Sequence, residues 1–136
     1  MNTVTIKGTV FSGEGTGSQF VRIPWATRQI KEKLSFNPYF GTLNIHLPKR
    51  ETKKLEKILK ESKGIKITPA EGFSQAQCFN ILIMNKIKGA IVLPEKTNHP
   101  PNVLEIIAPV HLRKTLSLKD SDEVKLTIYL DTNIKS

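Results

Sequence analysis

The feature that most constrains the fold is a glycine-rich loop at residues 13–17, where glycine recurs at every second position between two apolar, strand-like runs. A phosphate-binding P-loop requires a lysine after its glycines, and a dinucleotide-binding turn requires a different glycine spacing; both lead into a helix. Here residues 20–23 predict a strand, as residues 3–11 do before the loop. Those two nucleotide-binding folds are therefore excluded. Backbone amides in such a loop can surround a phosphate, and an ordinary hairpin loop is the simpler alternative.

The remaining apolar runs predict a mostly β protein. About eight short strands are expected, at residues 3–11, 20–23, 42–47, 64–68, 77–84, 86–93, 103–107 and 124–130. Helices are expected at residues 25–34, 49–61 and 109–116, and none is placed for regular βαβ crossovers. This order favours a small β-barrel with two or three short helices over a doubly wound sheet. We expect residues 1–136 to form a single domain, with a frayed tail after residue 131.

Composition narrows the class of protein. The 136 residues contain no run near the roughly 20 apolar residues that span a bilayer, and no signal peptide is expected. Cys78 is the single cysteine, so an internal disulfide is excluded and a reducing cytoplasm is expected. The formal net charge of +9 suits either a nucleic acid or a nucleotide. Many lysines lie on the predicted helix 49–61, whose Leu55, Ile58 and Leu59 mark one buried face, so charge alone does not choose the partner.

Two polar residues on the predicted strand 42–47 form a candidate metal site. Thr42 and Asn44 are two positions apart, so their side chains share one face while Leu43 and Ile45 point into the core. Magnesium takes oxygen ligands and often uses only one or two from the protein, the others coming from water and substrate phosphate. Neutral oxygens suit a site where a triphosphate supplies the negative charge. A solvent-facing strand edge, which His46 would share, is the alternative.

Glu105 is a second candidate, because it stands within the apolar run 103–107 and glutamate is rarely buried without a partner. A carboxylate there can orient a hydroxyl or act as a general base, whereas on an exposed strand face it needs no role. Arg113 can bind phosphate or simply be solvated. The histidines show no metal-ligand spacing, so no zinc site is expected. They are His46, His99 and His111.

Several segments, taken in order, resemble the archaeal CTP-dependent riboflavin kinases. They are Gly-x-Gly-x-Gly-x-x-Phe at residues 13–20, Pro-Tyr-x-Gly-Thr-Leu-Asn at 38–44, Gly-Ala-Ile-Val-x-Pro-x-x-Thr at 89–97 and Glu-Ile-Ile-Ala-Pro-x-x-Leu-Arg at 105–113. Their order and spacing match from about residue 4 to residue 130. The resemblance implies a cradle-loop β-barrel that transfers the γ-phosphoryl group of CTP to the ribityl 5′-hydroxyl of riboflavin, giving FMN and CDP.

The resemblance also implies the site residues. Mg²⁺ is expected on Thr42 and Asn44, and the flavin on Thr97 and Glu105. Glu105 is also the expected catalytic residue, orienting or deprotonating the acceptor hydroxyl. The implied nucleotide contacts are Glu14, Gly15, Thr16, Gly17, Ser18 and Gln19 in the glycine loop, and Val110, His111, Leu112 and Arg113 further along.

The partners that follow from the resemblance are small molecules, namely riboflavin or FMN and CTP or CDP. We expect a monomer in the cytoplasm, with no membrane and no nucleic-acid partner. Two alternatives stay open. Residues 112–124 are similar to a run in small swapped-hairpin DNA-binding barrels, and a flavin or nucleotide sensor would bind its ligand without turnover.

Overall fold

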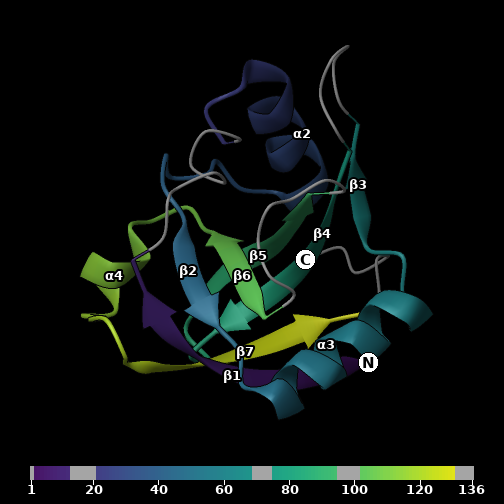
Figure 1. The fold of residues 1–136 in the computed structure, drawn as a ribbon. Coiled ribbons are helices and arrows are strands. Elements are labelled where there is room, and N and C mark those ends of the chain that lie inside the picture. Colours follow the sequence, from purple (N-terminus) through teal and green to yellow (C-terminus); the bar gives the residue numbers. More distant parts are fainter. Residues whose placement is uncertain (1, 13–20, 69–74, 95–101, 131–136) are drawn as a thin grey trace.

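The computed structural model describes residues 2–12, 21–68, 75–94 and 102–130 (Figure 1). Within these ranges the chain forms seven strands and three helices. The strands are β1 (Thr3–Phe11), β2 (Leu43–His46), β3 (Ile65–Ile67), β4 (Ala76–Ile83), β5 (Ile87–Pro94), β6 (Val103–Ile107) and β7 (Glu123–Tyr129). The helices are α2 (Pro24–Leu34), α3 (Lys49–Glu61) and α4 (Leu112–Thr115). None of the described helices is long and apolar enough to cross a membrane.

Six of the strands close into an antiparallel barrel. Their order is β4-β5-β6-β2-β1-β7, and the pairing of β7 with β4 completes the ring. Strand β3 pairs with β4 and extends the sheet beyond the ring. The small, mostly β barrel that the sequence predicts is therefore confirmed. Strand β2 lies between β1 and β6, so it is a central strand with a neighbour on each side.

Alternation along the strands separates two apolar clusters, because successive side chains point to opposite faces. The larger cluster fills the barrel and includes Ile6, Val10, Leu43, Ile45, Phe79, Ile81, Ile91, Leu104, Ile106, Val124, Leu126 and Ile128. The smaller one lies between α2 and the outer face of the barrel and includes Val21, Ile30, Leu34, Ile67, Ala76, Cys78, Ala90, Val92 and Ile107. Cys78 is fully buried there, as expected of a small core residue, and burial raises the pKa of its thiol to about 12.

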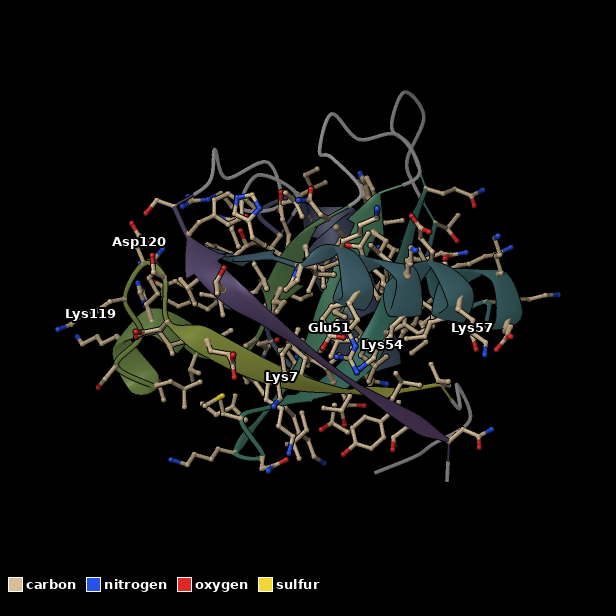
Figure 2. The ribbon with its side chains drawn as sticks, turned by 60° about the horizontal axis from the view of Figure 1, so that its bottom comes forward. Lys7, Glu51, Lys54, Lys57, Lys119 and Asp120 are labelled. Atoms are coloured by element: carbon tan, nitrogen blue, oxygen red, sulfur yellow. The ribbon has the colours of Figure 1, made fainter. Side chains whose placement is uncertain are left out.

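Helix α3 lies alongside β1 (Figures 1 and 2). Its predicted buried face is correct for Leu55 and Ile58, but Leu59 is 36% exposed. The third buried residue is Glu51 instead. Residues 51, 55 and 58 are four and three positions apart and so lie above one another on the helix. Leu59 falls at the margin of this narrow stripe, which explains its exposure.

Glu51 joins α3 to the edge of β1 (Figure 2). The Lys7 amide donates a hydrogen bond to Glu51 Oε1 at 2.9 Å. Lys54 Nζ lies 3.0 Å from Glu51 Oε2. Strand β2 pairs with β1 only from Thr9 onward. The carboxylate therefore supplies the Lys7 amide with the acceptor that a strand would otherwise provide.

The strand predicted at residues 20–23 is wrong over its described part. Val21 and Arg22 form a turn, and Pro24 begins α2. The carbonyls that a strand would offer to its neighbour are used by the helix. Val21 O accepts from Thr27 Oγ1 at 2.7 Å, and Ile23 O accepts from Thr27 N at 2.9 Å. Proline also suits the first helical position, since its missing N–H has no partner there.

Of the other predicted elements, those at residues 3–11, 49–61 and 103–107 form with the predicted ends, and the rest form with altered ends. The predicted helix 109–116 is reduced to Leu112–Thr115, and the predicted strand 42–47 to Leu43–His46. Thr42 therefore precedes the strand rather than starting it. The glycine loop and the tail after residue 131 lie outside the described residues.

Candidate functional site

Asn44 and Glu105 face each other across two neighbouring strands. Asn44 of β2 pairs with Glu105 of β6 on one side and with Phe11 of β1 on the other. Residues directly opposite in an antiparallel pair bring their Cβ atoms to within about 4.5–5.5 Å. The barrel therefore brings together a predicted magnesium ligand and the predicted flavin contact, which are far apart in the sequence.

Both side chains lie on the outer face of the barrel and are nevertheless buried. Leu43 and Ile45 belong to the inner cluster, so Asn44 between them points outward. Asn44 is only 8% exposed and Glu105 only 4%. The solvent-facing edge considered as an alternative for Asn44 is therefore wrong, because β2 is a central strand. At such depth, a carboxylate interacts with a nearby charge more strongly than it would in water.

Thr42 lines a pocket of about 120 Å³ next to this pair. The pocket also contains Leu43 and Ile106, which are paired across β2 and β6 and are the chain neighbours of Asn44 and Glu105. The remaining lining residues are Tyr39, Gly41, Ala108, Val110, His111, Leu112 and Arg113. One pocket thus joins a predicted magnesium ligand to the predicted nucleotide segment 110–113. Sites for whole drug-sized ligands commonly span roughly 300–1,000 Å³, so a pocket of this volume holds only part of such a ligand.

The segment 110–113 is held by a cap and an aromatic contact. His111 Nδ1 accepts a hydrogen bond from Lys114 N at 3.2 Å and so caps the short helix α4. Tyr39 N donates to Ala108 O at 2.8 Å, and the Tyr39 ring meets the His111 ring edge-on with centroids 5.0 Å apart. Tyr39 is 42% exposed. Aromatic surface is therefore accessible at the mouth of the pocket.

Arg113 connects this pocket to the end of β1. Arg113 Nη2 donates to Asp120 Oδ1 at 2.6 Å and to Ser12 Oγ at 3.3 Å. Ser12 Oγ in turn donates to the Asp120 carboxylate, at 3.1 Å to Oδ1 and 3.2 Å to Oδ2. The hydrogen bond from Arg113, and then the one from Ser12, hold the pKa of Asp120 below its ordinary value. Figure 2 shows Asp120 in the turn close to the end of β1.

Part of the predicted site lies outside the described residues. Thr97 and the glycine-loop contacts belong to this group, so their roles stay predictions. The loop contacts concerned are Glu14, Gly15, Thr16, Gly17, Ser18 and Gln19. Sequence reasoning missed Ser12, Tyr39 and Asp120. Tyr39 stands in one of the segments that carry the resemblance, but no signal in the sequence pairs Ser12 with Asp120, because 108 positions separate them.

The described donors suit a hard divalent cation. Thr42 and Asn44 offer neutral oxygens, and Glu105 places a carboxylate opposite Asn44. Magnesium accepts such ligands and completes its shell with water and phosphate oxygens. Among the described residues there is no group of three or more His, Cys, Asp or Glu that could hold a metal ion. The chemistry of the Thr42, Asn44 and Glu105 oxygens fits a magnesium ion, for which a phosphate-bearing ligand would supply further oxygens.

Comparison with known proteins gives two consistent results. A family model with the short name CTP-dep_RFKase, described as "Domain of unknown function DUF120", matches residues 10–128. A riboflavin kinase of Archaeoglobus fulgidus is 43% identical over 132 residues, which are 94% of this chain and 56% of that protein. A riboflavin kinase of Sulfurisphaera tokodaii is 42% identical over 129 residues, which are 92% of this chain and 95% of that protein.

The relatives differ in length. The chain spans a little over half of the Archaeoglobus fulgidus protein but almost all of the Sulfurisphaera tokodaii one. A riboflavin kinase of Ignicoccus hospitalis lies between them, 37% identical over 93% of this chain and 72% of its own length. The family model covers most of the barrel, from the end of β1 to the end of β7. The chain therefore belongs to the archaeal CTP-dependent riboflavin kinase family.

Proposed function

We propose that this protein transfers the γ-phosphoryl group of CTP to the 5′-hydroxyl of riboflavin, with Mg²⁺, and releases FMN and CDP. The observation that carries the proposal is the buried pair Asn44–Glu105, directly beside a pocket lined by Thr42 and residues 110–113. The predicted oxygen ligands, a buried carboxylate and the segment predicted to contact the nucleotide therefore come from neighbouring parts of the fold, which supports the proposal. The names of the family and of its relatives support this choice of substrates.

In the proposed reaction the riboflavin hydroxyl oxygen forms a bond to the γ-phosphorus, and the bond from that phosphorus to the β,γ-bridging oxygen breaks. The hydroxyl proton leaves to a base. Phosphoryl transfer needs little covalent chemistry from the protein and depends on positioning and charge stabilisation. Thr42 and Asn44 are the residues that would hold Mg²⁺, which when bound supplies positive charge to the phosphate oxygens.

Glu105 is the group we assign to the acceptor hydroxyl. Its side chain is buried and stands opposite Asn44, so a hydroxyl that contacts it would lie close to a proposed magnesium ligand. A carboxylate within hydrogen-bond reach of a hydroxyl orients its lone pair and accepts its proton. The segment 110–113 would contact the nucleotide, with the guanidinium of Arg113 available to the phosphates.

The experiment that tests the proposal is the conversion of riboflavin to FMN, separated by chromatography and followed by flavin fluorescence. CTP and ATP are supplied in parallel, each with and without magnesium. We expect turnover only with CTP and magnesium. Turnover with ATP alone would retain the kinase and overturn the donor. Absence of FMN with folded protein would favour a nucleotide or flavin sensor, or a nucleic-acid-binding barrel.

Two substitutions test the metal ligands. Thr42→Val and Asn44→Leu each remove an oxygen and should reduce magnesium-dependent turnover more than riboflavin binding. Thr127→Val and Asn80→Leu are matched controls, because both residues are half-buried on the outer face of other strands. Wild-type turnover in both site variants would remove Thr42 and Asn44 from the site.

Two further expectations have their own measurements. Light scattering of the purified protein checks the expected monomer. Fractionation of cells checks the expected cytoplasmic location.

A further inference from the structure

Arg113 is held by residues that lie outside the pocket. Its side chain donates to Asp120 and Ser12, as described above. Its main chain is held as well, because Leu118 N donates to Arg113 O at 2.8 Å. Both the guanidinium and the backbone of Arg113 are therefore tied to neighbouring structure, although the residue stands at the start of a helix of only four residues.

The turn that carries Asp120 is tied to β1 in the same way. Ser121 N donates to Val10 O at 2.7 Å, and Val10 N donates to Asp122 O at 2.9 Å. Ser121 has a φ of 76°, in the left-handed region that few residues other than glycine adopt. Such a conformation persists only where the surrounding structure determines it. The backbone thus fixes the position of Asp120 relative to Ser12, which follows β1.

Stability does not explain the ion pair between Arg113 and Asp120. Their side chains are 31% and 59% exposed, and ion pairs this exposed contribute little to folding. Geometry offers a better account. Both hydrogen bonds that Arg113 donates to described side chains come from Nη2. Among the described residues none accepts from its Nε or Nη1, so these donors can bind a ligand. A guanidinium is planar and carries five N–H donors, so it can bind a phosphate with the donors that remain.

We propose that Asp120 and Ser12 are positioning residues for Arg113. They hold its guanidinium between the pocket and Ser12 at the end of β1, where it binds the phosphate groups of the nucleotide. Neither residue needs to touch the nucleotide, because each acts through Arg113. This inference rests on the proposed function, since it assigns a nucleoside phosphate to that pocket.

The test compares nucleotide binding with turnover in Asp120→Asn and Ser12→Ala. Binding of CDP is measured by isothermal titration calorimetry, and KM is measured separately for CTP and riboflavin. We expect the Kd for CDP and the KM for CTP to rise about three- to tenfold, the scale of coupling between contacting residues. The KM for riboflavin should not change. Glu123→Gln is the control, because it removes one charge nearby from a side chain with no contact to Arg113 among the described residues.

A double-mutant cycle separates positioning from a general structural effect. In an Arg113→Ala background, adding Asp120→Ala should cause no further loss of CDP binding, because Asp120 acts through the side chain already removed. An equal loss in both backgrounds overturns the proposal. Thermal unfolding shows whether each variant folds. If the Asp120 variants do not fold, CDP binding by Ser12→Ala tests the positioning role instead.

The outcomes also distinguish this inference from the proposed function. If the wild type binds CDP and forms FMN while Asp120→Asn and Ser12→Ala bind CDP equally well, only the positioning role is overturned. If the wild type neither binds CDP nor forms FMN, the proposed function is overturned, and the positioning role with it.

Discussion

Glu51 provides a direct test of how the barrel edge is stabilised. The substitution Glu51→Ala removes the acceptor of the Lys7 amide, 2.9 Å away, and the partner of Lys54, 3.0 Å away. A hydrogen bond to a charged group contributes about 1.5–3 kcal/mol, and a helix-surface ion pair about 0.2–0.5 kcal/mol. We therefore expect Glu51→Ala to lower the free energy of unfolding by about 2–3 kcal/mol, or Tm by roughly 6–12 °C.

Urea unfolding followed by circular dichroism measures this difference. Glu56→Ala is the matched control, because Glu56 is exposed on the same helix and forms no hydrogen bond or ion pair with a described residue. Lys54→Ala separates the ion pair from the hydrogen bond and should cost less than about 0.5 kcal/mol. If Glu51→Ala costs no more than Glu56→Ala, the carboxylate does not support the edge of β1 and the reasoning is refuted.

The same contacts predict how the effect of Glu51 depends on pH. Burial raises the pKa of Glu51, but the hydrogen bonds from Lys54 and from the Lys7 amide outweigh it, so the pKa lies below its ordinary 4.5. When the pKa of a carboxyl is lower in the folded state, its stabilisation is complete at pH values above its pKa in the unfolded state. The stabilisation is lost as the pH falls through its pKa in the folded state. The stability difference between the wild type and Glu51→Gln should therefore be constant near neutral pH and shrink below pH 4.5.

Three further predictions concern the site and the core. Glu105→Gln should slow FMN formation and leave CDP binding unchanged, if the carboxylate accepts the proton; an unchanged rate would exclude the base role. Gly8→Ala should destabilise the barrel by about 1–3 kcal/mol, because its Cβ would lie 2.6 Å from the carbonyl oxygen of His46 in β2; an unchanged urea midpoint would contradict this. Cys78 should react slowly with a thiol reagent until the protein is unfolded, because burial raises its pKa to about 12; rapid labelling of the native protein would show that the outer apolar cluster opens.

Local sequence patterns were sufficient to predict most of the helices and strands. The alternation along residues 3–11 and the apolar run at residues 103–107 predict strands that the structure contains, and the stripe of Leu55 and Ile58 predicts α3. The strand predicted at residues 20–23 is wrong over the described residues 21–23, where a short apolar run is compatible with a strand or with the start of a helix. Hydrogen bonds from Thr27 decided that case, and a short run of sequence does not reveal them.

The sequence by itself determined which side chains point into the barrel and which point out, because a strand alternates its faces regardless of its neighbours. It also carried the segments that mark the family. The tertiary structure alone decided which outward residues meet. Asn44 lies opposite Glu105 because β2 pairs with β6 in this register, and Ser12 lies beside Asp120 because β1 pairs with β7. Register depends on the packing of the whole core, and a shift of one residue would turn every such side chain to the other face.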